Sequence, residues 1–338
     1  MLIKTATALY LSIWKTGADG PSKKADAGSN PFPIKTAFNG GGATAMLGGI
    51  EAGGTKFVCA AGQKDGTILD RIEFPTGEPD ETLRQVIRYF KDFPIEAIGI
   101  GSFGPIDIRP DSQTYGCITA TPKTAWRNCP FLQTIKNALQ IPAGFTTDVN
   151  AAALGEASFG AAKNADSCLY LTVGTGIGAG AIMNGRFVQG LSHPEMGHIY
   201  VRRHPDDGYK GNCPYHTDCL EGLAAGPAIE KRWGKKAYLL TDLKEVWELE
   251  GYYIAEALVQ YILILSPEKI ILGGGVMKQR QLFSYIRQHV KKRLNQYIDL
   301  PDIENCIVPP QLGIHSGAAG SLVLAEQALE AANREAGK

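Results

Sequence analysis

The sequence lacks the features that mark several specialised classes of protein. None of its apolar runs reaches the roughly 18 residues that a membrane-spanning helix needs. Neither sign of charge is in excess, because 34 Lys and Arg balance 34 Asp and Glu. Without a basic excess there is no global field that attracts nucleic acid or acidic membranes. We therefore expect no nucleic-acid partner and no membrane partner.

Cysteine is too sparse to form a disulfide scaffold. Seven cysteines, an odd number, are scattered over 338 residues, which is typical of reduced thiols. We therefore expect a cytoplasmic protein. Apolar residues at 44% and charged residues at 20% exclude a disordered chain and supply a large core. A chain of this length is expected to form about two domains.

The first 45 residues differ from the rest of the chain. They contain Pro and Gly clusters without sustained periodicity, and we interpret 1–45 as an irregular extension that is not part of the fold. We expect Met46 to be the natural start and removal of the extension to leave activity intact. From Met46 onward, strand and helix patterns alternate, which predicts an α/β protein. A boundary near 155–165 would divide this part into two halves of similar size.

The strand and helix patterns are regular enough to place the candidate motifs. Strands are predicted over 48–52, 56–61, 68–74, 95–101, 143–147, 169–173, 179–183 and 269–272. Helices are predicted over 80–93, with Asp80 as its cap, and over 149–159, 251–265, 281–297 and 315–333.

Glycine is abundant, at 40 residues, and it clusters at three turns. Gly53-Gly54-Thr55 and Gly174-Thr175-Gly176 each lie between two strands, and Gly273-Gly274-Gly275 follows a buried strand. Glycine lets backbone N–H groups approach an anion, threonine adds a hydroxyl, and Lys56 adds charge. Any one of these turns could be an ordinary hairpin, but three together favour phosphate binding.

Two common nucleotide-binding motifs do not fit these turns. The sequence has no Gly-x-x-x-x-Gly-Lys-Ser/Thr loop, and a dinucleotide fingerprint requires a helix after the turn. Here the chain continues as a strand after Gly53-Gly54. The pattern resembles the actin-like ATPases, in which two β-hairpins hold phosphate.

A compact set of histidine and cysteine residues predicts a metal site. Cys213, His216 and Cys219 follow one another with two residues between neighbours, and His198 lies a short way upstream. Four nitrogen and sulfur ligands suit tetrahedral zinc. The set contains no nucleophile or base and fills all four positions, so we predict a structural Zn²⁺. The alternative is a group of free thiols and surface imidazoles.

Asp148 is the candidate acid–base residue. It lies at a strand-to-helix junction, where Asp is also a preferred N-cap. It could instead take a proton from a substrate hydroxyl that attacks a phosphoryl group. Spacing alone leaves both roles open. Asn150 is similarly a sugar-hydroxyl partner or an ordinary residue of the first helical turn.

Glu195 and Glu221 are candidate substrate ligands. Each lies close in sequence to a predicted zinc ligand, and a metal-braced loop is a rigid platform for acceptors that recognise a polyol. The alternative for each is an exposed carboxylate.

Taken together, these motifs resemble the ROK family of sugar kinases, and within it the bacterial zinc-containing fructokinases. The resemblance runs from Met46 to about residue 330. It is carried by Gly48-Gly-Ile-Glu-Ala-Gly-Gly-Thr-Lys56, Thr147-Asp-Val-Asn-Ala-Ala-Ala153, Leu171-Thr-Val-Gly-Thr-Gly-Ile-Gly178, Glu195-Met-Gly-His198, Cys213-Pro-Tyr-His-Thr-Asp-Cys-Leu-Glu221 and Gly273-Gly-Gly-Val276.

The resemblance implies a two-domain sugar kinase/actin-like ATPase (ribonuclease H-like) fold with a cleft between the domains. The first domain would span 46–160 and the second 161–314, with a final helix over 315–335 that packs back on the first. A homodimer is also implied. The reaction implied is phosphorylation of D-fructose to fructose 6-phosphate by ATP with Mg²⁺.

The resemblance also assigns roles to individual residues. Asp148 would be the catalytic base, and Asn150, Glu195, His198 and Glu221 would contact the sugar. The phosphates would lie against Gly53, Gly54, Thr55, Lys56, Gly174, Thr175 and Gly176. The adenosine would lie against Gly226, Pro227, Gly273, Gly274, Gly275, Val276 and Met277. His198 would then be both a sugar contact and a zinc ligand.

Two departures from the family pattern affect these expectations. Many members have Asp where this chain has Glu51, whose longer side chain changes how Mg²⁺ could be held through water. Many glucokinases have Asn where this chain has Thr147, which weakens a glucose assignment. A kinase for mannose, glucose or a rarer epimer is the alternative activity. A sugar-responsive regulator that catalyses nothing is the alternative class.

Overall fold

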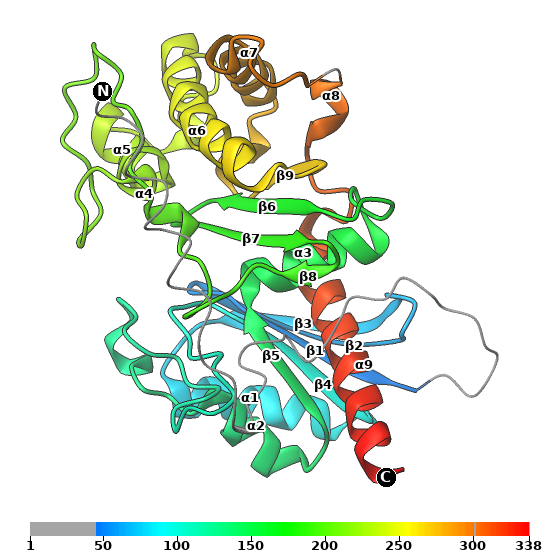
Figure 1. Cartoon of the computed structure of the whole chain (residues 1–338). Helices are drawn as coiled ribbons and strands as arrows, with labels where there is room; N and C mark the ends of the chain where they lie inside the picture. Colours follow the sequence, from blue (N-terminus) through cyan, green and yellow to red (C-terminus); the bar gives the residue numbers. More distant parts are fainter. Residues whose placement is uncertain (1–44, 301, 338) are drawn as a thin grey trace, which may run out of the picture. The chain divides into compact units, whose positions relative to one another are not determined.

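The computed structural model describes residues 45–300 and 302–337, and the extension predicted over 1–45 lies almost wholly outside them. The described part contains two five-stranded sheets with helices between and around them (Figure 1). Both sheets are mixed, and the fold is α/β as predicted.

The first sheet has the strand order β3-β2-β1-β4-β5. Strands β1 (Leu47–Ala52), β2 (Lys56–Gly62) and β3 (Ile68–Pro75) form an antiparallel meander. Strands β4 (Ala97–Ser102) and β5 (Ala143–Thr147) extend it in parallel with β1. Parallel strands end at the same edge of the sheet, so the carboxyl ends of β1, β4 and β5 lie together.

The second sheet repeats much of this plan with the order β10-β9-β6-β7-β8. Strands β6 (Cys168–Val173) and β7 (Ile177–Met183) form an antiparallel hairpin that β8 (Arg186–Phe187) extends. Strands β9 (Lys269–Gly273) and β10 (Ile307–Val308) continue in parallel with β6. Each sheet therefore has a β-hairpin whose turn is rich in glycine.

Helices cover both faces of the first sheet. Helices α1 (Pro79–Lys91) and α2 (Phe131–Leu139) share a core with Ile50, Ile98 and Ile100. The opposite face of the same sheet packs against α9 (Ser316–Ala336). The last helix of the chain thus covers one face of the sheet built from its first strands (Figure 1).

The second sheet has its own helical cover. Helices α6 (Lys244–Leu265) and α7 (Leu282–Leu294) share a large apolar core with β6 and β9. Helices α4 (Leu220–Ala224) and α5 (Gly226–Trp233) join the edge of this core, and α8 (Ile303–Cys306) leads into β10. Short 3-10 turns complete the connections: η1 (Thr124–Trp126), η2 (Met196–His198), η3 (Ala237–Leu239), η4 (Val276–Lys278) and η5 (Gly313–His315).

Helix α3 (Asp148–Phe159) links the two halves by packing on α9 and on β6 and β7. The two helices approach closely because a Cβ at Gly155 would meet Ser316 O at 2.2 Å, and one at Gly320 would meet Ala151 O at 1.7 Å. Any larger residue at either position would push the helices apart.

A buried carboxylate fastens the same junction. Glu156 accepts hydrogen bonds from the backbone N–H groups of Ala161, Gln311 and Leu312, at 2.7, 3.1 and 2.9 Å. It also accepts one from the Ser316 hydroxyl at 2.7 Å. Because these donors satisfy the charge, Glu156 can lie fully buried where the end of α3 meets the start of α9.

Two helix predictions need correction. The first helix starts at Pro79, and Asp80 lies inside its first turn rather than at the cap, which is Glu78 without a side-chain hydrogen bond. The long helix predicted from 251 starts at Lys244, because the buried residues Val246 and Trp247 anchor an earlier turn that carries no capping signal.

Candidate active site

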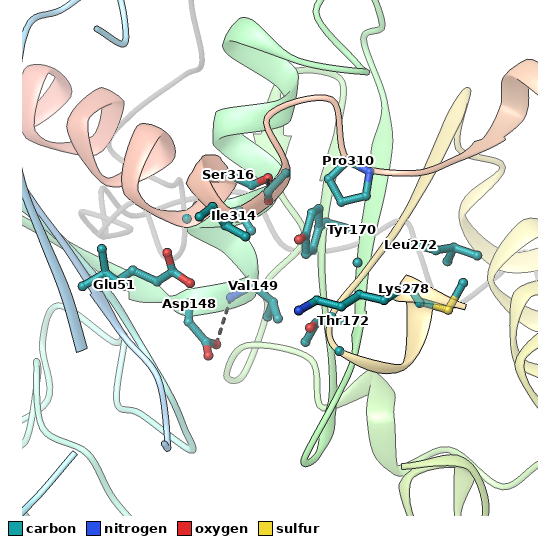
Figure 2. Close-up of a pocket in the computed structure, with 18 of the residues that line it drawn as sticks. Glu51, Asp148, Val149, Tyr170, Thr172, Leu272, Lys278, Pro310, Ile314 and Ser316 are labelled. Atoms are coloured by element: carbon teal, nitrogen blue, oxygen red, sulfur yellow. Dashed lines mark hydrogen bonds between the residues drawn. The ribbon is translucent and has the colours of Figure 1, made fainter. Parts of the chain in front are cut away.

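A cavity of about 430 Å³ lies where the two sheets face each other (Figure 2). This volume is within the range of small-ligand sites. The lining residues come from β1, β2, β6, β9, the turns η4 and η5 with the loops beside them, and the starts of α3 and α9. They are Glu51, Lys56, Val58, Asp148, Val149, Ala152, Tyr170, Thr172, Leu272, Gly273, Gly274, Gly275, Met277, Lys278, Arg280, Pro310, Gly313, Ile314, Ser316 and Gly317.

Asp148 points into this cavity from the first residue of α3 (Figure 2). It is not the N-cap: Thr147 is, because its hydroxyl accepts the Asn150 backbone N–H at 3.1 Å. Among the residues that the structure describes, the adjacent Val149 is the only one whose N–H donates to Asp148, to Oδ1 at 2.9 Å. Burial raises the pKa of Asp148 to about 6. The capping alternative is therefore removed, and the carboxylate remains available to the cavity as a weak base near neutral pH.

Glu51 is a second carboxylate at the cavity, at the end of β1. Burial, and then the charge of Asp148, raises its pKa to about 7, although Lys56 and Arg71 oppose this. Its carboxyl lies over the start of α9, where a Cβ at Gly317 would come within 2.5 Å of it. Its Oε2 is buried without a hydrogen-bond partner among the described residues. An unpaired buried oxygen of this kind fits a hydrated cation such as Mg²⁺.

The first glycine-rich turn is a tight hairpin braced from the side. Gly53 N–H donates to Lys56 O at 2.9 Å, and Thr76 hydroxyl donates to Gly53 O at 2.7 Å. Lys56 lines the cavity, whereas Gly53, Gly54 and Thr55 lie outside its lining. The Lys56 ammonium forms an ion pair with Glu73 at 3.0 Å.

The second glycine-rich turn meets the other two predicted nucleotide segments. Gly226 N–H, at the start of α5, donates to Gly174 O at 2.7 Å, and Gly174 N–H donates to Gly176 O at 2.9 Å. Gly274 has a φ of +94°, and a Cβ there would meet Val173 O at 2.4 Å. Only glycine fits this position without strain. Residues far apart in the sequence therefore converge, with Gly273, Gly274, Gly275 and Met277 in the cavity lining.

Three other predicted nucleotide residues lie outside the cavity lining. Pro227 lies in the first turn of α5, Val276 is buried in η4, and Thr175 belongs to the β6–β7 turn.

Of the predicted sugar ligands, Glu195 lies beside the carboxyl end of β4. Its Oε1 is 3.6 Å from the position of a Cβ at Gly104 and 3.6 Å from Nδ1 of His193. The Glu195 side chain is 46% exposed, so solvent can reach it. Even so, partial burial and then the charges of Asp148 and Glu221 raise its pKa to about 7. Glu195 thus belongs to the same electrostatic cluster as Asp148.

Glu221 and Asn150 are held more tightly than Glu195. Glu221 Oε2 accepts the Ile177 N–H at 2.9 Å, which ties α4 to the turn before β7. Asn150 is buried, and its amide donates to Thr146 at 3.1 Å. Neither residue lines the cavity described above.

The predicted metal ligands form one cluster. The candidate ligand atoms of His198, Cys213, His216 and Cys219 all lie within 4.8 Å of one another. Cys213 Sγ is 3.7 Å from Nδ1 of both histidines, and Cys219 Sγ is 3.5 Å from Nδ1 of His198. Zinc–sulfur and zinc–nitrogen bonds in a tetrahedron place such atoms about 3.6 Å apart. The donor set therefore fits zinc.

Some residues that line or support the cavity were not predicted from the sequence. Lys278 and Arg280 line it three and five residues after Gly275, and Ser316 and Gly317 reach it from α9. His193, which accepts the Ile106 N–H at 3.0 Å, holds the loop that carries Glu195. The basic residues after the glycine-rich turn were a signal that could have identified Lys278.

Comparison with known proteins assigns the chain to a class. The family model described as "ROK family" matches residues 47–328, so the chain belongs to the ROK family. A Bacillus subtilis (strain 168) protein named "Putative fructokinase" is 70% identical over 85% of this chain and 97% of its own length. The fructokinase of Pediococcus pentosaceus is 50% identical over 84% of this chain and 99% of its own length.

Solved structures agree with the fold. The ROK hexokinase from Thermus thermophilus has a TM-score of 0.69 at 26% identity, over 85% of this chain and 99% of its own. The fold is thus the two-domain actin-like ATPase fold of ROK sugar kinases. Among the described residues, none of the helices is long and apolar enough to cross a membrane.

Proposed function

We propose that this protein is a fructokinase, which transfers the γ-phosphoryl group of ATP to D-fructose and produces fructose 6-phosphate. The observation that carries this proposal is that one cavity contains both the Asp148 carboxylate, which does not cap α3, and the glycine-rich turn Gly273–Gly275. Relatives that are 46–70% identical and carry the name fructokinase support the choice of sugar.

Asp148 acts as the general base in this proposal. The sugar's primary hydroxyl would lie against its carboxylate, which takes the proton as the hydroxyl oxygen attacks the γ-phosphorus. A pKa near 6 suits this role, since the group is ionised at pH 7 and can still hold a proton. Glu195, His198, Glu221 and Asn150 would orient the sugar hydroxyls. His198 turns its Nδ1 toward Cys213 and Cys219, so its Nε2 would be available for the sugar.

The phosphates would contact Lys56 and the backbone of the three glycine-rich turns, with the adenosine between Gly226–Pro227 and Gly273–Met277. Mg²⁺ would be held near Glu51, and when bound it neutralises phosphate charge. The backbone of Ala318 at the start of α9 acts to lower the pKa of Glu51, and the buried Oε2, which has no partner among the described residues, would face the hydrated ion.

Zinc, in this proposal, has a structural role. Burial raises the pKa of the Cys219 thiol to about 12, so a thiolate at this position needs a bound cation. The metal would fix the loop between η2 and α4, which carries Glu195 and Glu221 at its two ends. We also propose the division into domains 46–160 and 161–314 with the helix 315–335, and a homodimer.

The test is a coupled assay for ADP release on zinc-replete protein, comparing kcat/KM for fructose, mannose and glucose with Mg-ATP. We expect a preference for fructose of at least tenfold. A preference for another hexose would move the assignment within the same reaction. The absence of turnover with every hexose tried, in protein whose zinc content is confirmed, would reject the kinase assignment.

A further inference from the structure

Lys278 occupies a position that the proposed roles above leave unexplained. It is the last residue of η4, and the two residues before it are almost fully buried, with Val276 4% and Met277 3% exposed. Gln279 N–H closes the turn by donating to Val276 O at 3.1 Å. The backbone of Lys278 is therefore held in one place directly after the Gly273–Gly275 turn.

The side chain of Lys278 extends into the cavity. Figure 2 shows it extended, with its ammonium group turned toward the side on which Asp148 and Val149 lie. It enters from the second sheet, whereas Asp148 enters from the first. A ligand that fills the cavity would lie between the two groups.

The ammonium group of Lys278, unlike that of Lys56, forms no ion pair with a described residue. Lys56 shares Glu73 with Arg71, at 3.0 and 2.7 Å. Lys278 has no side-chain hydrogen bond or ion pair with any residue that the structure describes. An ammonium group on a flexible stem is a common phosphate ligand, because it acts as a point charge that follows the anion.

We propose that Lys278 is the residue that binds the β-phosphate of ATP and stabilises the leaving group during phosphoryl transfer. This inference rests on the proposed function. It follows from the geometry, because the acceptor hydroxyl belongs at Asp148 and the departing ADP therefore belongs on the opposite side, where Lys278 enters.

The reaction step balances without any further reactant. A bond forms between the sugar oxygen and the γ-phosphorus, and the bond between that phosphorus and the bridging oxygen breaks. The bridging oxygen keeps the electron pair and becomes a β-phosphate oxygen of ADP. The hydroxyl proton goes to Asp148. Lys278 transfers no proton and acts only through its charge and hydrogen bonds.

The test uses the full chain with AMP, ADP and ATP as separate ligands in titration calorimetry. Lys278→Met removes the charge and keeps much of the stem. We expect it to weaken ADP and ATP binding about 10- to 100-fold, the range for a charged hydrogen bond, and to leave AMP binding unchanged. Lys278→Arg should recover much of the loss. Equal weakening of AMP would overturn the proposal, because AMP has no β-phosphate.

Kinetics separate this proposal from the proposed function. The unaltered protein is assayed first, and its failure to phosphorylate any hexose would count against the kinase assignment alone. If it is active, Lys278→Met should lower kcat at saturating ATP at least tenfold and leave sugar binding intact. Lys292→Met, an exposed lysine on α7 away from the cavity, is the matched control and should change neither constant. Wild-type kinetics in Lys278→Met, or a loss seen only in Arg280→Met, would overturn the proposal.

Discussion

The two walls of the cavity differ in chemistry although the two sheets that form them share a plan. The first sheet and the start of α3, which follows it, supply Glu51 and Asp148, both with raised pKa values, and a lysine already paired with Glu73. The second sheet supplies three glycines, Lys278 and Arg280, and none of the described lining residues on that side is acidic. In the proposed function, the first wall therefore provides the base, the Mg²⁺ site and Lys56, whereas the second wall holds the leaving-group side of ATP.

We expect the largest effect on activity when Asp148, the proposed base of the first wall, is replaced. We expect Asp148→Asn to lower kcat about 10³-fold, because the amide cannot accept the hydroxyl proton. Fructose and ADP binding, measured by calorimetry, should stay within about threefold of the wild type, since the substitution is isosteric and the Val149 N–H keeps its acceptor. A variant that retains a tenth of the activity would show that proton abstraction happens elsewhere.

Glu51 tests whether the acidic wall also serves the metal. Glu51→Gln should raise the Mg²⁺ concentration needed for half-maximal activity at least tenfold, because a neutral amide binds a hydrated cation poorly. Glu51→Asp should be closer to the wild type, as the shorter carboxylate keeps the charge. The measurement is initial rate against free Mg²⁺ at fixed ATP. An unchanged Mg²⁺ dependence in Glu51→Gln would remove this residue from the metal site.

The cluster of His198, Cys213, His216 and Cys219 lies on neither wall, because the described lining contains no histidine or cysteine. Cys213→Ser should reduce bound zinc from about one ion per chain to near zero, as measured by mass spectrometry. It should raise the KM for fructose about tenfold by loosening the loop that carries Glu195 and Glu221. ADP binding should change little. An equal loss of ADP binding would mean that the cluster supports both walls.

The smallest effect concerns stability and its dependence on pH. Burial raises the pKa of Asp148 from 3.8 to about 6, so the folded chain holds this proton more tightly than the unfolded chain does. Above pH 6 the buried charge therefore lowers the free energy of unfolding by roughly 2–3 kcal/mol, and this cost vanishes as the pH falls toward 4.

Thermal unfolding of Asp148→Asn across that pH range checks the sign. The variant should melt a few degrees above the wild type at pH 8, and the difference should shrink between pH 6 and pH 5. A variant that is less stable than the wild type at pH 8 would contradict the pKa direction.

Several parts of the fold followed from local patterns. The glycine-rich turns with apolar flanks predicted both hairpins, and the spacing of His198, Cys213, His216 and Cys219 predicted a cluster that the structure brings together. Asp148 was also a candidate from the sequence. Only the hydrogen bond from the Asn150 N–H to the Thr147 hydroxyl shows that Thr147, and not Asp148, caps the helix.

Other parts depend on contacts that no local pattern contains. The orphaned oxygen of Glu51 results from its approach to Gly317, a residue on the last helix. Strands of two residues, such as β8 and β10, are too short for alternation to indicate them. The sequence around Lys278 does not by itself distinguish it from the other lysines of the chain. Only its place in the cavity, opposite Asp148, does so.

The position of α9 has a consequence for synthesis of the chain. This helix covers β1 and β4, places Leu322 and Ala325 in the core, and brings Ser316 to the cavity. Its covering face is so close that a Cβ at Gly99 would meet Ser321 O at 2.0 Å. A ribosome that adds about 5–20 residues per second needs on the order of tens of seconds to proceed from β5, the last strand of this sheet, to α9.

During that interval the first sheet has emerged but one of its faces lacks its partner. The nascent chain therefore exposes an apolar sheet surface for a period in which it can associate with other chains or with a chaperone. A chain that is cut short before residue 316 would contain Asp148, both glycine-rich hairpins and the four candidate metal ligands, and yet would have neither a covered first sheet nor a complete cavity.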